Sequence, residues 1–236
     1  MIFAAGIGKR LGEITAARPK ALVEINGRSM LRIAVEFVAS YGFDDIIINI
    51  HHFAGMVEKE IEILKQEGFR ISVSDERELL LDTGGGLYKA RWFFDNEPFL
   101  LFNTDIITDL DLGSFYAFHK LKHGIASLAV AERDHNRVFL TDRNGIVCGW
   151  LNRKTGERII SKNVNEALKE ISFSGIHIVD PEIFRFMKDG VYSLTALYLE
   201  LARTRKIFTY RHDEDFWADI GTPEDLLAVK RKFEAS

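Results

Sequence analysis

The chain has 236 residues, a length that fits one large α/β domain or, less well, two small ones. Apolar residues make up 47% of it, enough for a substantial core, and a net charge of −4 argues against a broad nucleic-acid footprint. Its single cysteine, Cys148, excludes an intramolecular disulfide and suits a reducing compartment. No apolar run approaches the roughly 18 residues of a membrane span, and no secretory signal pattern opens the chain. We therefore expect a cytoplasmic protein that binds neither nucleic acid nor membrane.

Strands and helices alternate over the first half of the chain. Apolar runs predict strands, and 3.6-residue spacing of apolar side chains predicts helices. The predicted strands are 1–5, 46–50, 69–73 and 99–102, and the predicted helices are 30–38, 54–66 and 87–94. Such alternation requires right-handed crossovers and a mostly parallel sheet.

The second half changes character after a helix predicted at 114–121. Its predicted strands are shorter, at 125–131, 138–141, 146–151, 173–179 and near Phe208, with helices near Pro181 and Thr195 and a last helix opened by Pro223. Asn144-Gly145 indicates a hairpin. With no Pro-rich or Ser-rich linker, the sequence predicts one Rossmann-like α/β domain, with a mostly parallel, mixed sheet flanked by helices.

A glycine-rich segment follows the first strand, with Ala5, Gly6 and Gly8 ahead of Arg10. Glycines let backbone N–H groups approach a phosphate, and a cationic side chain can neutralise it. The pattern alone is weak, because Leu11 stands where a dinucleotide fingerprint needs glycine or alanine. A surface turn with two incidental glycines is the alternative.

Lys20 follows shortly after, in a Pro-Lys-Ala segment. A lysine next to proline is normally an exposed loop residue. Arg10 and Lys20, however, are expected near the same edge of the sheet. Two cations that converge on a triphosphate would stabilise charge on a departing pyrophosphate.

Two carboxylates occupy strand ends. Asp105 closes a buried strand, at the edge where α/β sheets place ligands, and Asp219 precedes Gly221-Thr222-Pro223. Such aspartates can hold Mg²⁺, which takes one or two carboxylates plus phosphate and water oxygens. Helix capping explains either aspartate equally well when each is considered alone.

Three consecutive glycines, Gly84 to Gly86, follow Asp82-Thr83 and open a helix. Their backbone entropy cost is understandable if a flat base or ribose lies against bare backbone. A flexible loop is the alternative explanation.

Taken together, these segments resemble the sugar-1-phosphate nucleotidyltransferases over essentially the whole chain. Ala-Ala-Gly-x-Gly-x-Arg-Leu followed by Pro-Lys is similar to the family signature, although Ala21 replaces the second proline of Pro-Lys-Pro. Members of the family also carry a few more residues before the first strand. The resemblance implies a glycosyltransferase A-like fold, with Arg10 and Lys20 on the triphosphate and Ala5, Gly6 and Gly8 at the nucleotide.

The other two segments extend the resemblance. Asn103-Thr104-Asp105 is similar to the family's Asn-Gly-Asp, and Trp-x-Asp-Ile-Gly-Thr-Pro is similar to its second metal segment, which implies Mg²⁺ held by Asp105 and Asp219. The Thr-Gly-Gly-Gly form resembles the small N-acetylmuramate 1-phosphate uridylyltransferases. By this resemblance Thr83, Gly84 and Gly85, together with Asn103, would contact the nucleotide.

The strand around Ser174-Gly175 resembles the family strand that lines the sugar side, although the Glu-Lys-Pro tripeptide of larger relatives is missing. The resemblance implies transfer of a nucleotidyl group, with UTP favoured, to a sugar 1-phosphate with release of pyrophosphate. Residues 1–122 would form the nucleotide-binding half and 123–236 the sugar-binding half.

Three alternatives stay open. One is a cytidylyltransferase that acts on a small alcohol phosphate such as phosphocholine. A second is a catalytically silent sensor of nucleotide sugars, which need not keep Arg10, Lys20 and both aspartates. A third is a glycosyltransferase, whose Asp-x-Asp metal pair is matched by Asp109-Leu110-Asp111. That string does not directly follow the strand, so we expect helix-capping or surface roles for both aspartates.

Overall fold

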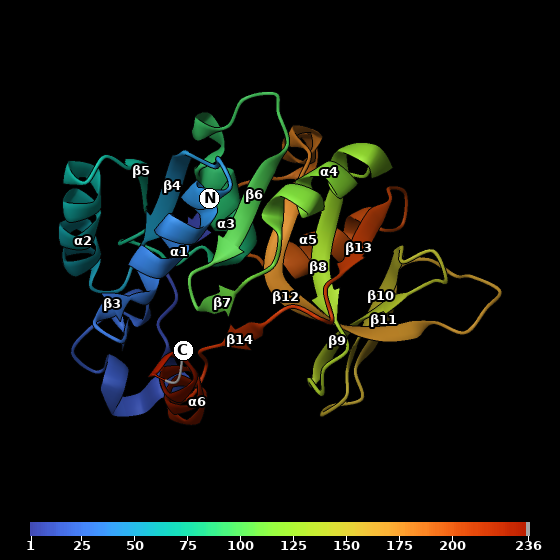
Figure 1. Ribbon diagram of the computed structural model, residues 1–236. Helices are drawn as coiled ribbons and strands as arrows, with labels where there is room; N and C mark the ends of the chain where they lie inside the picture. Colours follow the sequence, from blue (N-terminus) through green and yellow to red (C-terminus); the bar gives the residue numbers. More distant parts are fainter. Residues whose placement is uncertain (235–236) are drawn as a thin grey trace. The chain divides into compact units, whose positions relative to one another are not determined.

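The computed structural model describes residues 1–234 and divides the chain into two compact units that are interleaved in sequence (Figure 1). Unit 1 comprises Met1–Leu81, Phe102–Leu110 and the chain from Phe216 onward. Unit 2 comprises Asp82–Leu101 and Asp111–Asp215. The assignment of 1–122 to the nucleotide and of 123–236 to the sugar remains a prediction.

Unit 1 is built on a parallel sheet, as the sequence predicts. Its central strand β1 (Ile2–Phe3) pairs in parallel with β4 (Asp45–Ile50) and with the end of β6 (Phe99–Asn103), and β4 pairs in parallel with β5 (Arg70–Asp75). Every residue of β4 from Ile46 to Ile50 is buried. This is typical of a parallel strand covered on both faces.

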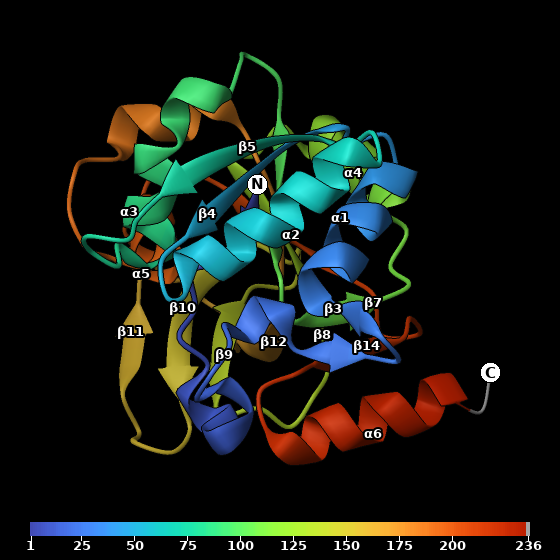
Figure 2. The ribbon, with the colours of Figure 1, turned by 90° about the vertical axis from the view of Figure 1, so that its left-hand side faces the viewer.

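Two helices of unit 1 begin and end close to their predicted positions. Helix α1 (Met30–Ser40) begins at Ser29, whose hydroxyl accepts a hydrogen bond from the Arg32 N–H, and it buries a stripe of apolar side chains. Helix α2 (Ala54–Gln66) has the predicted bounds and lies along β4 and β5 (Figure 2).

Short two-stranded pieces complete unit 1, and the sequence does not predict them. β2 (Glu24–Ile25) and β3 (Arg28–Ser29) form a hairpin, and β7 (Ile106–Thr108) pairs antiparallel with β14 (Trp217–Asp219). The C-terminal helix is α6 (Pro223–Glu234). These pieces share one apolar cluster: Leu11, Val23, Ile25, Met30, Ile107, Ile220, Leu226 and Val229.

Unit 2 is mixed. β8 (Ala126–Ala131) pairs antiparallel with β12 (Lys169–Val179) and parallel with β13 (Ile207–Arg211). β9 (Arg137–Thr141), β10 (Val147–Asn152) and β11 (Arg158–Ile160) add antiparallel strands. The hairpin predicted at Asn144-Gly145 is confirmed, because β9 and β10 flank it and Gly145 has a φ of 71°.

The helices of unit 2 include one whose bounds the sequence places wrongly. Helices α4 (Leu112–Lys122) and α5 (Leu194–Leu201) form near their predicted positions. Helix α3 runs over Asp82–Lys89, so it contains the triple glycine and both begins and ends earlier than the predicted 87–94. No helix within residues 1–234 is both long enough and apolar enough to cross a bilayer.

Candidate active site

The glycine segment of unit 1 is a packed and hydrogen-bonded loop, and not an incidental surface turn. Gly8 has a left-handed φ of 72°, and a 3₁₀ helix, Lys9–Thr15, follows it. The Thr15 hydroxyl donates to the backbone carbonyl of Gly8 at 3.1 Å. Leu11, only 1% exposed, anchors the loop in the apolar cluster of unit 1. Leu11 is therefore a core residue at the position where a dinucleotide fingerprint would need glycine or alanine.

Gly8 also brings the loop against Lys20. A Cβ atom on Gly8 would lie 2.9 Å from the Cβ of Lys20, closer than side chains tolerate. Glycine is required here both by the positive φ and by this approach. The predicted proximity of the glycine loop and Lys20 is thus present within unit 1.

The ribbon of β7 and β14 brings the two predicted aspartates together. Asp219 lies opposite Ile106 in the antiparallel register, and the N–H of Ile220 donates to the backbone carbonyl of Asp105 at 2.9 Å. Asp105 and Asp219 therefore lie at the same end of the ribbon, although 114 positions separate them in the numbering (219 − 105).

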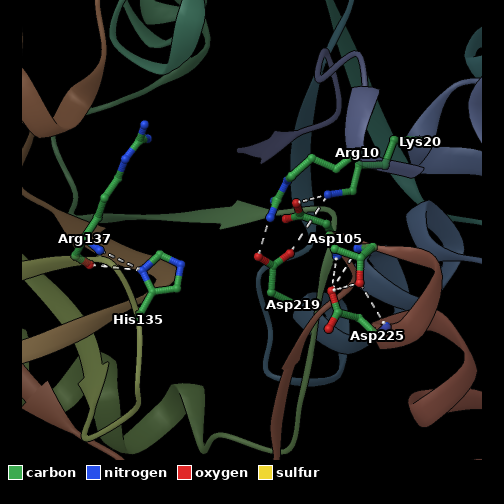
Figure 3. A network of polar contacts seen from close by, with 9 residues as sticks. Arg10, Lys20, Asp105, His135, Arg137, Asp219 and Asp225 are labelled. Carbon is green, nitrogen blue, oxygen red and sulfur yellow. Dashed lines mark hydrogen bonds and ion pairs between the residues drawn. The ribbon is translucent and has the colours of Figure 1, made fainter. Parts of the chain in front are cut away.

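Two cations face these carboxylates (Figure 3). Lys20 Nζ donates to Asp105 Oδ2 and lies 3.9 Å from Asp219 Oδ1. Arg10 Nη2 lies 3.8 Å from Asp219 Oδ2. The Lys20 side chain is only 13% exposed, whereas that of Arg10 is 66% exposed. Lys20 is thus the less exposed cation of the cluster, and Arg10 extends toward solvent, where it can meet an anionic substrate.

The environment of Asp219 fits a bound cation. Burial raises the pKa of Asp219 to about 6, with a further rise from Asp105, and Lys20 and Arg10 only partly oppose it. Its Oδ1 is buried and has no hydrogen-bond partner within the described residues. An additional cation beside Asp105 and Asp219 would compensate this buried charge.

The chain supplies few ligands beyond this pair. Within residues 1–234, no group of three or more histidine, cysteine, aspartate or glutamate side chains could hold a metal ion. Two carboxylates alone are a donor set that suits Mg²⁺, because Mg²⁺ usually completes its shell with phosphate and water oxygens. Asp105 and Asp219 would be the residues that hold it.

Asp225 and Gly221 support the site, and sequence analysis misses both. The Asp225 carboxylate accepts hydrogen bonds from the N–H groups of Gly221 at 3.2 Å and Thr222 at 2.8 Å, while the Thr222 hydroxyl accepts from the Asp225 N–H at 3.2 Å. This is a reciprocal capping box at the start of α6. The Thr-Pro-x-Asp spacing is the signal that could have identified it.

Gly221 makes room for Arg10. A Cβ atom at Gly221 would lie 2.7 to 2.9 Å from the guanidinium of Arg10. If Arg10 binds the triphosphate, as the family resemblance implies, Gly221→Ala should displace this guanidinium and raise the KM for the triphosphate by about tenfold. Initial-rate kinetics measure the change.

Gly55→Ala is the matched control, because a Cβ atom at Gly55 of α2 meets nothing within 4 Å. The control should leave KM unchanged. An equal rise in both variants, or in neither, would contradict the role assigned to Gly221.

Asp219→Asn should stabilise the metal-free protein at neutral pH. A folded-state pKa raised from 3.8 to about 6 means that the carboxyl group contributes stability below pH 4, which is lost as pH rises through 6. The asparagine variant avoids that loss, so its advantage in unfolding free energy should grow from near zero at pH 4 to at most about 3 kcal/mol at pH 7.5. Urea unfolding in EDTA measures it, and an advantage independent of pH would be the contrary result.

Thr83, Gly84 and Gly85 have contacts inside unit 2. The Thr83 hydroxyl accepts from the Leu194 N–H at 2.9 Å, and the Gly84 N–H donates to the backbone carbonyl of Tyr192 at 2.8 Å. A Cβ atom at Gly84 would lie 2.5 Å from the Tyr192 ring. Packing therefore requires glycine at position 84, and the contact of this segment with a nucleotide stays a prediction.

Ser174 belongs to a buried polar cluster of unit 2. Its hydroxyl lies 2.6 Å from His212 Nε2 and accepts a hydrogen bond from Arg133 Nη1 at 2.9 Å. Ser174 is fully buried, and Gly175, with a φ of 77°, lies at an irregularity in the pairing of β12. Sequence analysis misses Arg133 and His212, and the sugar contact of Ser174 and Gly175 stays a prediction.

The remaining predicted residues have defined places. Asn103 ends β6 and lies opposite Phe3, the last residue of β1, and its nucleotide contact stays a prediction. Asp111 caps α4 and accepts from the Ser114 N–H at 3.0 Å, while Asp109 accepts from the Phe216 N–H at 2.7 Å. The expectation of capping and surface roles for these two aspartates is confirmed, because each carboxylate accepts a hydrogen bond from a backbone N–H group.

Residues 1–236 match the model of the nucleotidyl transferase family throughout. The chain belongs to this family. An N-acetylmuramate α-1-phosphate uridylyltransferase of Caulobacter vibrioides is 28% identical, over 98% of this chain and 95% of that protein. A mannose-1-phosphate guanylyltransferase catalytic subunit β of Dictyostelium discoideum is 25% identical, over 97% of this chain and 62% of that longer protein.

A UDP-glucose pyrophosphorylase from Acinetobacter baumanii has a similar structure. Its TM-score is 0.75 at 17% identity, and the match covers 98% of this chain and 91% of that protein. At this identity the likeness shows the fold. The predicted fold class, a mixed sheet flanked by helices in a glycosyltransferase A-like nucleotidyltransferase fold, is confirmed, and membership of this transferase family identifies the chain as an enzyme.

Proposed function

We propose that this protein transfers a nucleotidyl group from a nucleoside triphosphate, with UTP favoured, to a sugar 1-phosphate, and releases pyrophosphate. The observation that supports the proposal is the convergence of Arg10, Lys20, Asp105 and Asp219 in one cluster of unit 1. Two cations beside two carboxylates suit a reaction in which the substrates are polyanions and the cofactor is a hard cation.

Asp105 and Asp219 would hold Mg²⁺, which supplies charge neutralisation at the reacting phosphate when it is bound. Arg10, the exposed cation, would bind the outer phosphates of the triphosphate. Lys20 would stabilise the negative charge that develops on the departing pyrophosphate. Because Lys20 already contacts Asp105, its ammonium group is held in place before substrate arrives.

The proposed chemistry is a single displacement. A phosphate oxygen of the sugar 1-phosphate forms the new bond to the α-phosphorus, and the bond from the α-phosphorus to the β-phosphate's bridging oxygen breaks. The nucleophile is already anionic, so the chain needs to supply neither a general base nor a covalent nucleophile. Positioning and charge compensation by the cluster account for the catalysis.

Uracil is the favoured base for two reasons. The Thr83-Gly84-Gly85-Gly86 segment resembles the small uridylyltransferases, and the Caulobacter relative, which matches over nearly its full length, is named as one. The guanylyltransferase relative covers the chain almost equally well at 25% identity, so guanine is the next candidate.

Pyrophosphate release tests the proposal. Four nucleoside triphosphates are each combined with a panel of sugar 1-phosphates, and with phosphocholine, in the presence of Mg²⁺. Release that requires UTP and one sugar 1-phosphate together supports the proposal and names the sugar. Pyrophosphate release with cytidine triphosphate and phosphocholine would show that the acceptor is a small alcohol phosphate and not a sugar 1-phosphate. Nucleotide binding without pyrophosphate release from any pair would contradict the proposed activity.

A further inference from the structure

Two polar side chains are buried beside the start of the glycine loop in unit 1. Asn49 lies in β4, next to Phe3 of β1, and Glu76 follows the end of β5. They are 3% and 1% exposed, respectively. Burial of an amide and of a carboxyl group carries a large desolvation cost unless each finds partners.

The two side chains form a continuous hydrogen-bond chain. The Ala4 N–H donates to Asn49 Oδ1 at 2.8 Å, and Asn49 Nδ2 donates to Glu76 Oε1 at 2.7 Å. The Leu81 N–H donates to Glu76 Oε2 at 3.1 Å. Because the chain has a backbone donor at each end, the orientation of the Asn49 amide is fixed and both Glu76 oxygens act as acceptors.

The two ends of this chain are the points in unit 1 from which the predicted nucleotide segments depart. Ala4 immediately precedes Ala5 and the glycine loop, and Leu81 immediately precedes Asp82 and Thr83. A pair of apolar side chains would fill the same space without the desolvation cost. The presence of a buried polar pair at Asn49 and Glu76 is therefore explained by the hydrogen bonds that it accepts from the backbone N–H groups of Ala4 and Leu81.

We infer that Asn49 and Glu76 are positioning residues for the nucleoside triphosphate, an inference that rests on the proposed function. Recognition of phosphate and base by backbone groups requires those groups to stay within about 0.5 Å of their productive positions. Asn49 and Glu76 fix the backbone immediately before both recognition segments without contacting the nucleotide themselves.

Single and double variants separate this role from general stability. In Glu76→Gln, one carboxylate oxygen becomes an NH₂ group that must face another donor, either Asn49 Nδ2 or the Leu81 N–H. In Asn49→Asp, a second carboxylate faces Glu76. The double variant Asn49→Asp with Glu76→Gln can re-form each of the three hydrogen bonds described above. The carboxylate introduced at position 49 accepts from the Ala4 N–H and from the side-chain NH₂ group introduced at position 76. The amide oxygen at position 76 then accepts from the Leu81 N–H.

Calorimetric titration of UTP with Mg²⁺, without sugar phosphate, is the first readout. Each single variant should weaken binding by about tenfold, the effect of an unsatisfied buried partner, and the double variant should recover to within about threefold. Amide hydrogen exchange is the second readout. Protection at Ala4 and Leu81 should fall in the single variants and return in the double variant, whether or not nucleotide is present.

Ser127→Ala is the control, because it removes a buried hydrogen bond of 2.9 Å to His119 in unit 2. It should lower the melting temperature and leave UTP affinity unchanged. The inference is overturned if the single variants bind UTP as the parent does, if the double variant binds no better than the weaker single variant, or if the control weakens binding equally. A parent protein that binds no UTP contradicts the proposed function itself, and the positioning role falls with it.

Discussion

Asp105→Asn is expected to lower kcat by about a thousandfold or more while the fold persists. The substitution removes one of the two carboxylates that would hold Mg²⁺, and charge stabilisation by a bound metal supplies several kcal/mol to such reactions. The fold should persist because the backbone carbonyl of Asp105, which accepts from Ile220, is unaffected, and asparagine has nearly the same shape as aspartate.

Pyrophosphate release and thermal unfolding measured on the same preparation test this prediction. Asp111→Asn is the matched control, since Asp111 is the cap of α4 and has no place in the proposed cluster. The control should lose about 1 kcal/mol of stability at most and keep its turnover. Turnover retained by Asp105→Asn, or lost equally by the control, would contradict the metal assignment.

Lys20→Met should have two opposite effects. Turnover should fall by about a hundredfold or more, because the cation that would stabilise the departing pyrophosphate is gone. Binding of Mn²⁺ in the absence of nucleotide should instead tighten by about tenfold, because the Lys20 ammonium no longer shares Asp105 and Asp219 with the metal. Electron paramagnetic resonance of free Mn²⁺ measures the second effect independently of activity.

Lys9→Met is the control for the loss of a lysine. Lys9 is exposed in the same glycine loop, and the structure gives it no contact with Asp105 or Asp219. Turnover and Mn²⁺ affinity should both stay near those of the parent. Weaker Mn²⁺ binding by Lys20→Met would show that Lys20 helps to hold the metal and would contradict the proposed division of roles.

Local patterns predict the long elements of this fold well. Apolar side chains at helical spacing predict the bounds of α2, and an isoleucine-rich segment, interrupted only by Asn49, predicts β4. The ribbon of β7 and β14 is not predicted, because each strand has only three residues and the pairing joins segments more than 100 residues apart. Its formation depends on the shared apolar cluster around Ile107 and Ile220.

The functional residues also divide into those that local sequence motifs predict and those that only the three-dimensional structure reveals. Arg10, Lys20, Asp105 and Asp219 are predicted because they stand in family-like motifs, and the structure brings all four together. Glu76 has no such signal, since a lone glutamate after an exposed strand is normally a solvated residue. Its burial becomes visible only when the partners Ala4, Asn49 and Leu81 are assembled in three dimensions.

The central claim is that one displacement joins two substrates in this cluster, and ³¹P NMR of a single reaction tests it most directly. With Mg²⁺, a nucleoside triphosphate and its matching sugar 1-phosphate, we predict that pyrophosphate and a nucleotide sugar appear together at a ratio of one to one. Neither product should form when either substrate is left out. Pyrophosphate formed with nucleoside monophosphate, or with no nucleotide sugar, would show hydrolysis instead of transfer and would contradict the account.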